Sequence, residues 1–324
     1  MRVKFNTISQ VINRSNPAMS LPNTSIHDAY ALKFRMKIKN SWGAAVTPEM
    51  EDILKSIEQI VVTTDSTKVN YSLSGLDLAR RSAVSSAMGT DRVIDRTFTS
   101  LADGASVDVS FVLYLDEGDI IASAHDQIEL KVAFLQNVKQ GTGEDAAKKI
   151  ELVDPECKLT IVENIPTAEE FYSKYGQKLE LVAEPKVYAI TTTCPANTEF
   201  TDIMDLPTGT LLGGSMVHFE GGTPELVGLI RTTPDRIELK KVDWDTMRAI
   251  DERRFRTKIP AGLINFDYGV QWQSNGVGKD AWNFSKGDVR LAAKTNNPLT
   301  IRYVSFEKIV NTAVYDKLYP FTQY

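Results

Sequence analysis

The clearest pattern of apolar and polar positions in this chain is a strict alternation over eight residues. Four apolar side chains alternate there with four cations: Leu32, Lys33, Phe34, Arg35, Met36, Lys37, Ile38 and Lys39. A period of two is typical of a strand with one buried face. The cations could form a binding stripe, but we expect a solvated outer face that also protects a sheet edge from aggregation.

Shorter alternations recur along the chain and are interrupted by two helical patterns. The segments Val107 to Leu113, Ile128 to Phe134 and Leu299 to Tyr303 are predicted strands. Leu76 to Met88 is a predicted helix, and so is Asp243 to Glu252, with Asp243 placed to cap it. Many short antiparallel strands predict a mostly β chain folded as sandwiches or jelly rolls.

Four short motifs occur twice, in the same order and with unequal spacers. The first copies are LPNT at Leu21–Thr24, TPEM at Thr47–Met50, the segment Val61–Arg81 and the segment Gly118–Phe134. The second copies are LPTG at Leu206–Gly209, TPEL at Thr223–Leu226, the segment Leu229–Ala249 and the segment Gly287–Phe306. In this alignment Asp77 and Arg80 coincide with Asp245 and Arg248. The repetition predicts a tandem duplication, with domains over 21–165 and 201–310 and a linker over 166–200.

The two ends of the chain differ from the rest. Residues 1–20 contain basic but no acidic side chains, and Phe5, Ile8, Val11 and Ile12 fit one face of a short helix. From the residues alone we favour a locally packed terminus over a basic amphipathic arm on a membrane or a neighbouring subunit. The aromatic tail, 311–324, either packs on its own domain or docks on another chain.

Composition removes several classes of function. The net charge of -5 argues against general nucleic-acid binding. No apolar run approaches the ~20 residues of a membrane span. The first residues lack the apolar core of a signal peptide, so we expect synthesis in a cytoplasm. The two cysteines, Cys157 and Cys194, are expected to be free buried thiols.

Candidate chemistry is sparse. The three histidines have no metal-chelating spacing, and Gly276 to Lys279 lacks the rest of a P-loop. Asp116, Glu117 and Asp119 are candidate Ca²⁺ ligands, although acidic loops are more often simply solvated. Asp243 and Asp245 flank Trp244, where carboxylates usually cap a helix. We therefore expect no catalytic residue, no organic cofactor and at most a structural Ca²⁺ ion.

The motifs of the second copy carry a resemblance to a known family. Its clearest part consists of Leu206–Gly209 before a strand, Leu229–Arg231 at the start of a hairpin and Asp243–Arg248 at the start of a helix. The matching stretch of the first copy, Ile57 to Arg81, is weaker. The chain resembles the double jelly-roll major capsid proteins of tailless icosahedral viruses with an internal membrane. The resemblance covers most of residues 21–310.

This resemblance implies a structural protein rather than an enzyme. It implies two tandem eight-stranded antiparallel jelly rolls, each with a short inserted helix, and homotrimers of pseudo-hexameric outline that tile a virion capsid. Partners would be other copies, penton and spike proteins and the internal membrane, without sequence-specific nucleic acid. The arm would face the membrane through Arg2, Lys4, Phe5 and Arg14. The tail would contact other subunits through Tyr315, Tyr319, Phe321 and Tyr324.

Two other functions remain compatible with paired β domains. One is a secreted glycan-acting enzyme that stacks sugars on tryptophans; the candidates are Trp42, Trp244, Trp272 and Trp282. The other is a tandem carbohydrate-binding or spike module with aromatic rows on one sheet. Both would expose aromatic side chains, whereas a capsid subunit needs broad polar-rimmed surfaces between copies.

Overall fold

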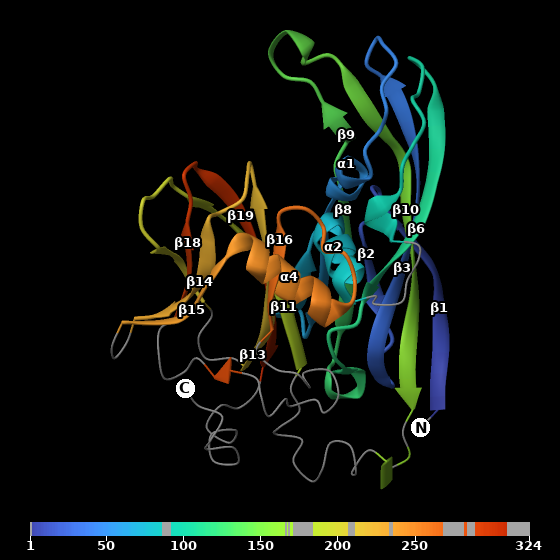
Figure 1. The fold of residues 1–324 in the computed structure, drawn as a ribbon. Coiled ribbons are helices and arrows are strands. Elements are labelled where there is room, and N and C mark those ends of the chain that lie inside the picture. Colours follow the sequence, from blue (N-terminus) through green and yellow to red (C-terminus); the bar gives the residue numbers. More distant parts are fainter. Residues whose placement is uncertain are drawn as a thin grey trace. The chain divides into compact units, whose positions relative to one another are not determined.

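The computed structural model describes residues 2–85, 92–165, 167, 169–170, 184–206, 211–232, 236–267, 282–283 and 289–309. The chain forms two compact units, Met1–Thr167 and Ala168–Tyr324. Figure 1 shows that each unit is built mainly from long antiparallel strands.

The first sheet of unit 1 has the strand order β1–β10–β3–β6. Its members are β1 (Arg2–Asn13), β10 (Lys149–Ile165), β3 (Ile26–Ser41) and β6 (Ser106–Leu115). Two short strands extend it, β7 (Ile120–Ile121) on β3 and β9 (Asn137–Gln140) on β10. The alternating residues of β3 are buried at Leu32, Phe34 and Ile38 and exposed at the cations between them, as predicted.

The second sheet of unit 1 has the order β5–β4–β8–β2. Its members are β5 (Lys68–Leu73), β4 (Ile57–Thr64), β8 (Ile128–Phe134) and β2 (Ala18–Leu21). If the eight main strands are counted along the chain, the two sheets have the orders 1-8-3-6 and 5-4-7-2. Apart from the β4–β5 hairpin, successive strands therefore alternate between the two sheets, which is the jelly-roll topology.

Unit 2 repeats this order. One sheet is β11 (Glu184–Cys194), β19 (Leu299–Ile309), β13 (Leu211–Glu220) and β16 (Leu263–Asp267), with β17 (Trp282–Asn283) paired to β13. The other is β12 (Thr201–Asp205), β18 (Val289–Lys294), β14 (Leu226–Arg231) and β15 (Ile237–Asp243). Counted in the same way, the orders are again 1-8-3-6 and 2-7-4-5. The duplication predicted from the sequence is confirmed as two tandem jelly rolls.

A helix follows the fifth main strand in both units. Helix α2 (Gly75–Ser85) follows β5, and α4 (Trp244–Phe255) follows β15. Ser74 begins α2 with reciprocal bonds, because its Oγ accepts from the Asp77 N–H while Asp77 Oδ2 accepts from the Ser74 N–H at 2.9 Å. The Asp243 carboxylate begins α4 by accepting from the Thr246 N–H at 2.9 Å, as predicted. A shorter helix, α1 (Met50–Lys55), precedes β4.

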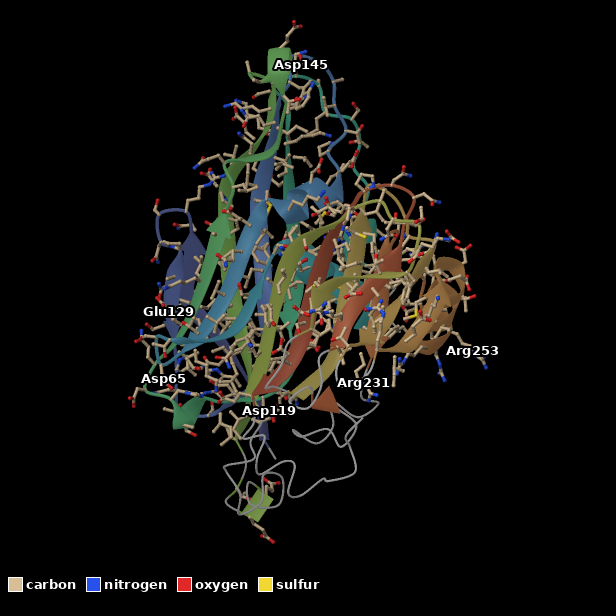
Figure 2. All side chains as sticks on the ribbon, turned by 90° about the vertical axis from the view of Figure 1, so that its left-hand side faces the viewer. Asp65, Asp119, Glu129, Asp145, Arg231 and Arg253 are labelled. Atoms are coloured by element: carbon tan, nitrogen blue, oxygen red, sulfur yellow. The ribbon has the colours of Figure 1, made fainter. Side chains whose placement is uncertain are left out.

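Apolar side chains from both sheets fill each roll. In unit 1, Phe34 lies between Phe111 and Phe134, with ring centroids 5.5 and 6.3 Å away. In unit 2, Trp244 packs edge-on against Phe219 at 5.6 Å within the core. The cysteines, Cys157 and Cys194, are free and buried, as expected. Unit 1 is elongated, with Asp145 at one end and Asp65 and Asp119 at the other (Figure 2).

Two expectations about the first half are corrected. Residues 2–13 and 18–21 form β1 and β2 rather than a separate helical arm, because β1 pairs along most of its length with β10 and buries Ile12. The apolar residues between positions 5 and 12 therefore lie in a strand and not on one face of a helix. Strand β3 is not an edge, since it lies between β10 and β6. Its cations cannot protect a sheet edge there.

Three expectations about the repeat are also corrected. The predicted linker, 166–200, contains β11, which is the first main strand of unit 2. The fourth motif aligned β8 with β19, whereas the strand orders make β8 the counterpart of β18. The helix caps show a further offset of one residue, because Asp77 corresponds to Thr246 rather than to Asp245.

Candidate functional site

The candidate Ca²⁺ loop of unit 1 is engaged in an ion pair. Arg81 on α2 donates to both carboxylate oxygens of buried Glu117, at 2.5 and 2.9 Å. Asp116 is exposed and Asp119 partly buried. In the part of the chain that the structure describes, no group of three or more His, Cys, Asp or Glu side chains is placed to hold a metal ion. The three predicted ligands therefore form no ligand set, and Glu117 fastens α2 to the segment after β6.

Three buried polar side chains lie beside this ion pair, and no local pattern in the sequence indicated them. His27 Nδ1 lies 2.9 Å from the Tyr30 hydroxyl, and the Tyr30 ring meets Tyr71 edge-on. Burial lowers the pKa of His27 to about 4, against the opposing effect of Glu163. Burial raises the pKa of Tyr71 well above its usual range. These groups are held neutral inside the roll.

The residues proposed for the N-terminal arm are spread along β1 and the turn after it. Lys4 lies 3.8 Å from Glu163, Phe5 is exposed, and Arg14 donates to the carbonyl of Leu135 at 2.6 Å. The side chain of Arg2 lies outside the described residues, as do the tail residues Tyr315, Tyr319, Phe321 and Tyr324 and the loop Gly276 to Asp280. The described members do not form one cluster.

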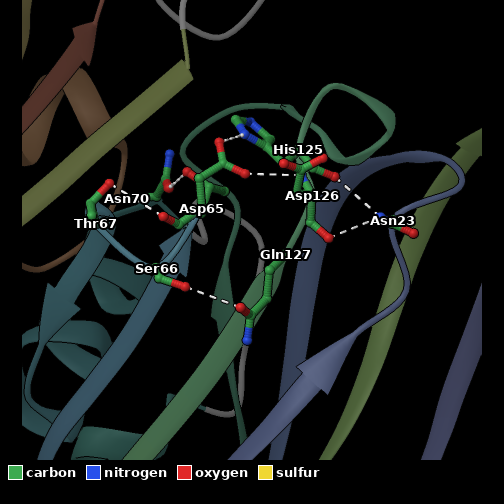
Figure 3. A network of polar contacts seen from close by, with 9 residues as sticks. Asn23, Asp65, Ser66, Thr67, Asn70, His125, Asp126 and Gln127 are labelled. Atoms are coloured by element: carbon green, nitrogen blue, oxygen red, sulfur yellow. Dashed lines mark hydrogen bonds and ion pairs between the residues drawn. The ribbon is translucent and has the colours of Figure 1, made fainter.

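Three loops at one end of unit 1 form a hydrogen-bonded layer (Figure 3). Asp65 Oδ2 lies 2.7 Å from His125 Nδ1, and Asp65 Oδ1 accepts from the Asp126 N–H at 2.9 Å. The Asn23 amide donates to the carbonyls of His125 and Asp126. The His125 hydrogen bond lowers the pKa of Asp65. Asp65 and Ser66 have φ values of 52° and 60°, so this layer holds the β4–β5 turn in a left-handed conformation.

Unit 2 buries a different polar cluster on facing residues of β11 and β19. Glu307 is fully buried, accepts from the Ser305 hydroxyl at 2.6 Å and pairs with Lys186 at 3.2 Å. Burial and the neighbouring Glu307 raise the pKa of Tyr188. The negative charge of this buried carboxylate is offset by the lysine, and one of its oxygens is bonded to the hydroxyl.

Helix α4 is fastened by its polar side chains. Arg248 donates to the carbonyls of Ile259 and Pro260, both at 2.8 Å. Asp251 is buried and accepts from the Asn265 N–H at 2.6 Å. Burial raises the pKa of Asp251 to about 6. Asp243 caps the helix and Asp245 is exposed, so the acidic pair around Trp244 supports the helix, as expected.

The described tryptophans do not form a sugar-binding row. Trp244 is in the core, Trp42 is partly buried, and the side chains of Trp272 and Trp282 lie outside the described residues. A shallow depression in unit 2 is lined by Ala196, Asn197, Thr198, Glu199, Thr201 and Asn296. It has one carboxylate and no aromatic side chain among those residues. Among the described residues, the polar groups above stabilise the two rolls.

No family model and no curated protein matches this sequence. Solved structures do match. The STIV MCP, from Sulfolobus Turreted Icosahedral Virus, superposes with a TM-score of 0.79 at 16% identity, over 98% of this chain and 99% of that chain. The PBCV-1 virus capsid gives a TM-score of 0.60 at 9% identity, over 94% of both chains. The major capsid protein of bacteriophage PM2 gives 0.58 at 10% identity, over 95% of this chain and 97% of that chain.

These similarities establish the fold of the whole chain as a double jelly roll. The strand orders of the two units agree with it independently. Among the described residues, no helix is long and apolar enough to cross a membrane.

Proposed function

We propose that this chain is a major capsid protein, a structural subunit that assembles with copies of itself into an icosahedral virion shell. The observation that carries the proposal is the similarity to the STIV MCP, which includes both rolls and covers 98% of this chain and 99% of that chain. Low identity is compatible with a shared architecture, because a scaffold constrains strand order and burial more than individual side chains.

The duplication supplies a physical reason for this role. A chain with two similar rolls offers two similar flanks, so three copies related by a threefold axis present six. A closed unit of that kind tiles a hexagonal lattice without any catalytic residue. In this proposal the capsid is the location of the protein, and penton proteins, spike proteins and an internal membrane are its further partners.

The mass of the assembled protein tests the proposal. Light scattering after size exclusion should give about 108 kDa, three times the chain mass of 36.1 kDa. Electron micrographs at high protein concentration should show shells or flat hexagonal arrays. A protein that stays monomeric at every concentration and cleaves or binds a glycan would contradict the proposal.

A further inference from the structure

The first sheet of unit 1 has an outer face, which we define as the side chains of β1, β10, β3 and β6 that point away from the core. Residues paired across antiparallel strands share a face. On β3 the outer positions are Ala29, Ala31 and the four cations from Lys33 to Lys39, since Leu32 and Phe34 between them are buried. Following the pairs from β3 across the sheet gives the composition of the whole face.

One half of the outer face has no charged side chain in its paired rows. One row runs Phe5, Val162, Ala29, and the next runs Thr7, Thr160, Ala31, Tyr114. Phe5 is 71% exposed and Tyr114 is 51% exposed, and Val3, beyond Phe5 on β1, is 53% exposed. Two aromatic side chains thus flank small residues on the central strands. Such a group of large exposed apolar side chains marks a contact surface.

The other half of the outer face is charged, with an excess of cations. Its cations are Lys33, Arg35, Lys37, Lys39 and Lys158, and its carboxylates are Asp108, Glu151 and Glu156. The cations on β3 are exposed, whereas Glu151 and Glu156 are partly buried. This half is therefore locally basic on a chain whose net charge is -5.

We infer that the outer face docks against an acidic surface of a second copy of this chain, an inference that rests on the proposed capsid function. Because the face is basic and the whole chain is acidic, the remaining surface of another copy carries the complementary charge. An uncharged aromatic centre beside a charged rim is the usual composition of a protein interface. The two partners use different surfaces, so the contact is head-to-tail and closes into a ring when the rotation allows.

The size of the face suits such a contact. Strand β3 extends over about 33 Å from Ala29 to Lys39 at ~3.3 Å per residue, and four strands ~4.8 Å apart are about 19 Å wide. The product, about 600 Å², is close to the ~800 Å² that each partner contributes to a standard interface.

Sedimentation velocity of the full chain tests this inference with two pairs of variants. Phe5→Ser/Tyr114→Ser removes the aromatic centre, and Lys33→Glu/Lys37→Glu reverses the charge. The matched controls are Val69→Ser and Lys131→Glu, which alter exposed residues on the other sheet of the same unit. Each face variant should raise the dissociation constant of the assembly at least tenfold, while the controls stay within about twofold of the unaltered protein. Unchanged melting temperatures will show that the variants are folded.

The outcomes separate this inference from the proposed function. If the unaltered chain assembles and both face variants assemble equally well, the docking surface is wrong and the capsid role stands. A chain that is monomeric at every concentration would overturn both. Cosedimentation with phosphatidylserine vesicles tests whether the outer face binds a lipid surface instead of a second copy. If the face variants lose vesicle binding while assembling normally, the face contacts lipid and the inference is overturned.

Discussion

The two jelly rolls share their strand order but hold their helices by different means. Helix α2 of unit 1 buries most of its length, including Leu78 and Val84, and Arg81 fastens it to Glu117 after β6. Helix α4 of unit 2 buries Trp244, Met247 and Asp251 and leaves Ile250 48% exposed. Its anchors are backbone groups before and within β16, bonded to Arg248 and Asp251.

This difference shows which part of the fold the duplicated sequence specifies. The strand pairing of each roll fixes where the helix begins, because β5 ends next to the capping residue Ser74 and β15 ends at the capping residue Asp243. The side chains that attach the helix to its roll are free to differ, provided that every buried charge has a partner. Unit 1 meets this requirement with an ion pair, and unit 2 meets it with backbone hydrogen bonds.

Breaking the ion pair should give the largest effect. Arg81→Met leaves the Glu117 carboxylate buried without its guanidinium, so we expect unit 1 to lose about 3 kcal/mol of stability. Denaturant titration followed by hydrogen exchange will measure the loss, and exchange in β6 will assign it to unit 1. Lys241→Ala is the control in unit 2, because the Lys241–Glu238 pair is exposed and contributes less than about 1 kcal/mol.

The double variant Arg81→Met/Glu117→Leu sharpens this prediction. Replacing both charges with apolar groups removes the unpaired carboxylate, so much of the lost stability should return. If the double variant is less stable than Arg81→Met, the ion pair is not the anchor of α2 and the contrast between the units fails.

The two units should respond to acid in opposite directions. His27 stays neutral in the folded protein down to about pH 4, whereas the unfolded chain protonates it near 6.5, so unit 1 loses about 3 kcal/mol as the pH falls through this window. Asp251 has a folded pKa of about 6 and an unfolded pKa of 3.8, so unit 2 loses about 3 kcal/mol as the pH rises through this window. Hydrogen exchange at pH 4, 5 and 6 measures each unit separately.

Single substitutions identify the groups responsible. His27→Gln should flatten the pH dependence of unit 1 alone, and Asp251→Asn should flatten that of unit 2 alone. Asn at position 251 keeps an oxygen that accepts from the Asn265 N–H, so the variant should remain folded. Parallel pH profiles for the two units of the unaltered protein would refute the assignment of His27 and Asp251.

The helix caps should give the smallest effect. Ser74→Ala removes the Oγ that accepts from the Asp77 N–H, and we expect a loss of about 1 kcal/mol in unit 1. Asp243→Ala removes an exposed cap in unit 2, where the helix is less buried. The melting temperature of this variant should therefore fall by less than that of Ser74→Ala. Circular dichroism during thermal melting measures both. A larger loss for Asp243→Ala would mean that α4 depends on its cap more than α2 does.

Much of the architecture could be predicted from local patterns. The alternation in β3, the helix after each hairpin, the Asp243 cap and the tandem repeat all follow from residues close together in the sequence. The same patterns failed for β1, whose apolar residues fit a helical face but pair with β10. They also failed at the end of β19, where Ser305, Glu307 and Lys308 look like surface residues and are buried.

The sequence by itself determined that the chain has two β domains of one design, because strand periodicity and capping chemistry act over a few residues. Only the tertiary structure decided which strands lie beside one another, since a ladder joins residues as distant as Phe5 and Val162. It also decided that Glu117 pairs with Arg81, which lies 36 positions away in the sequence. The partner of a buried charge depends on which elements the fold brings together, and no local pattern specifies that.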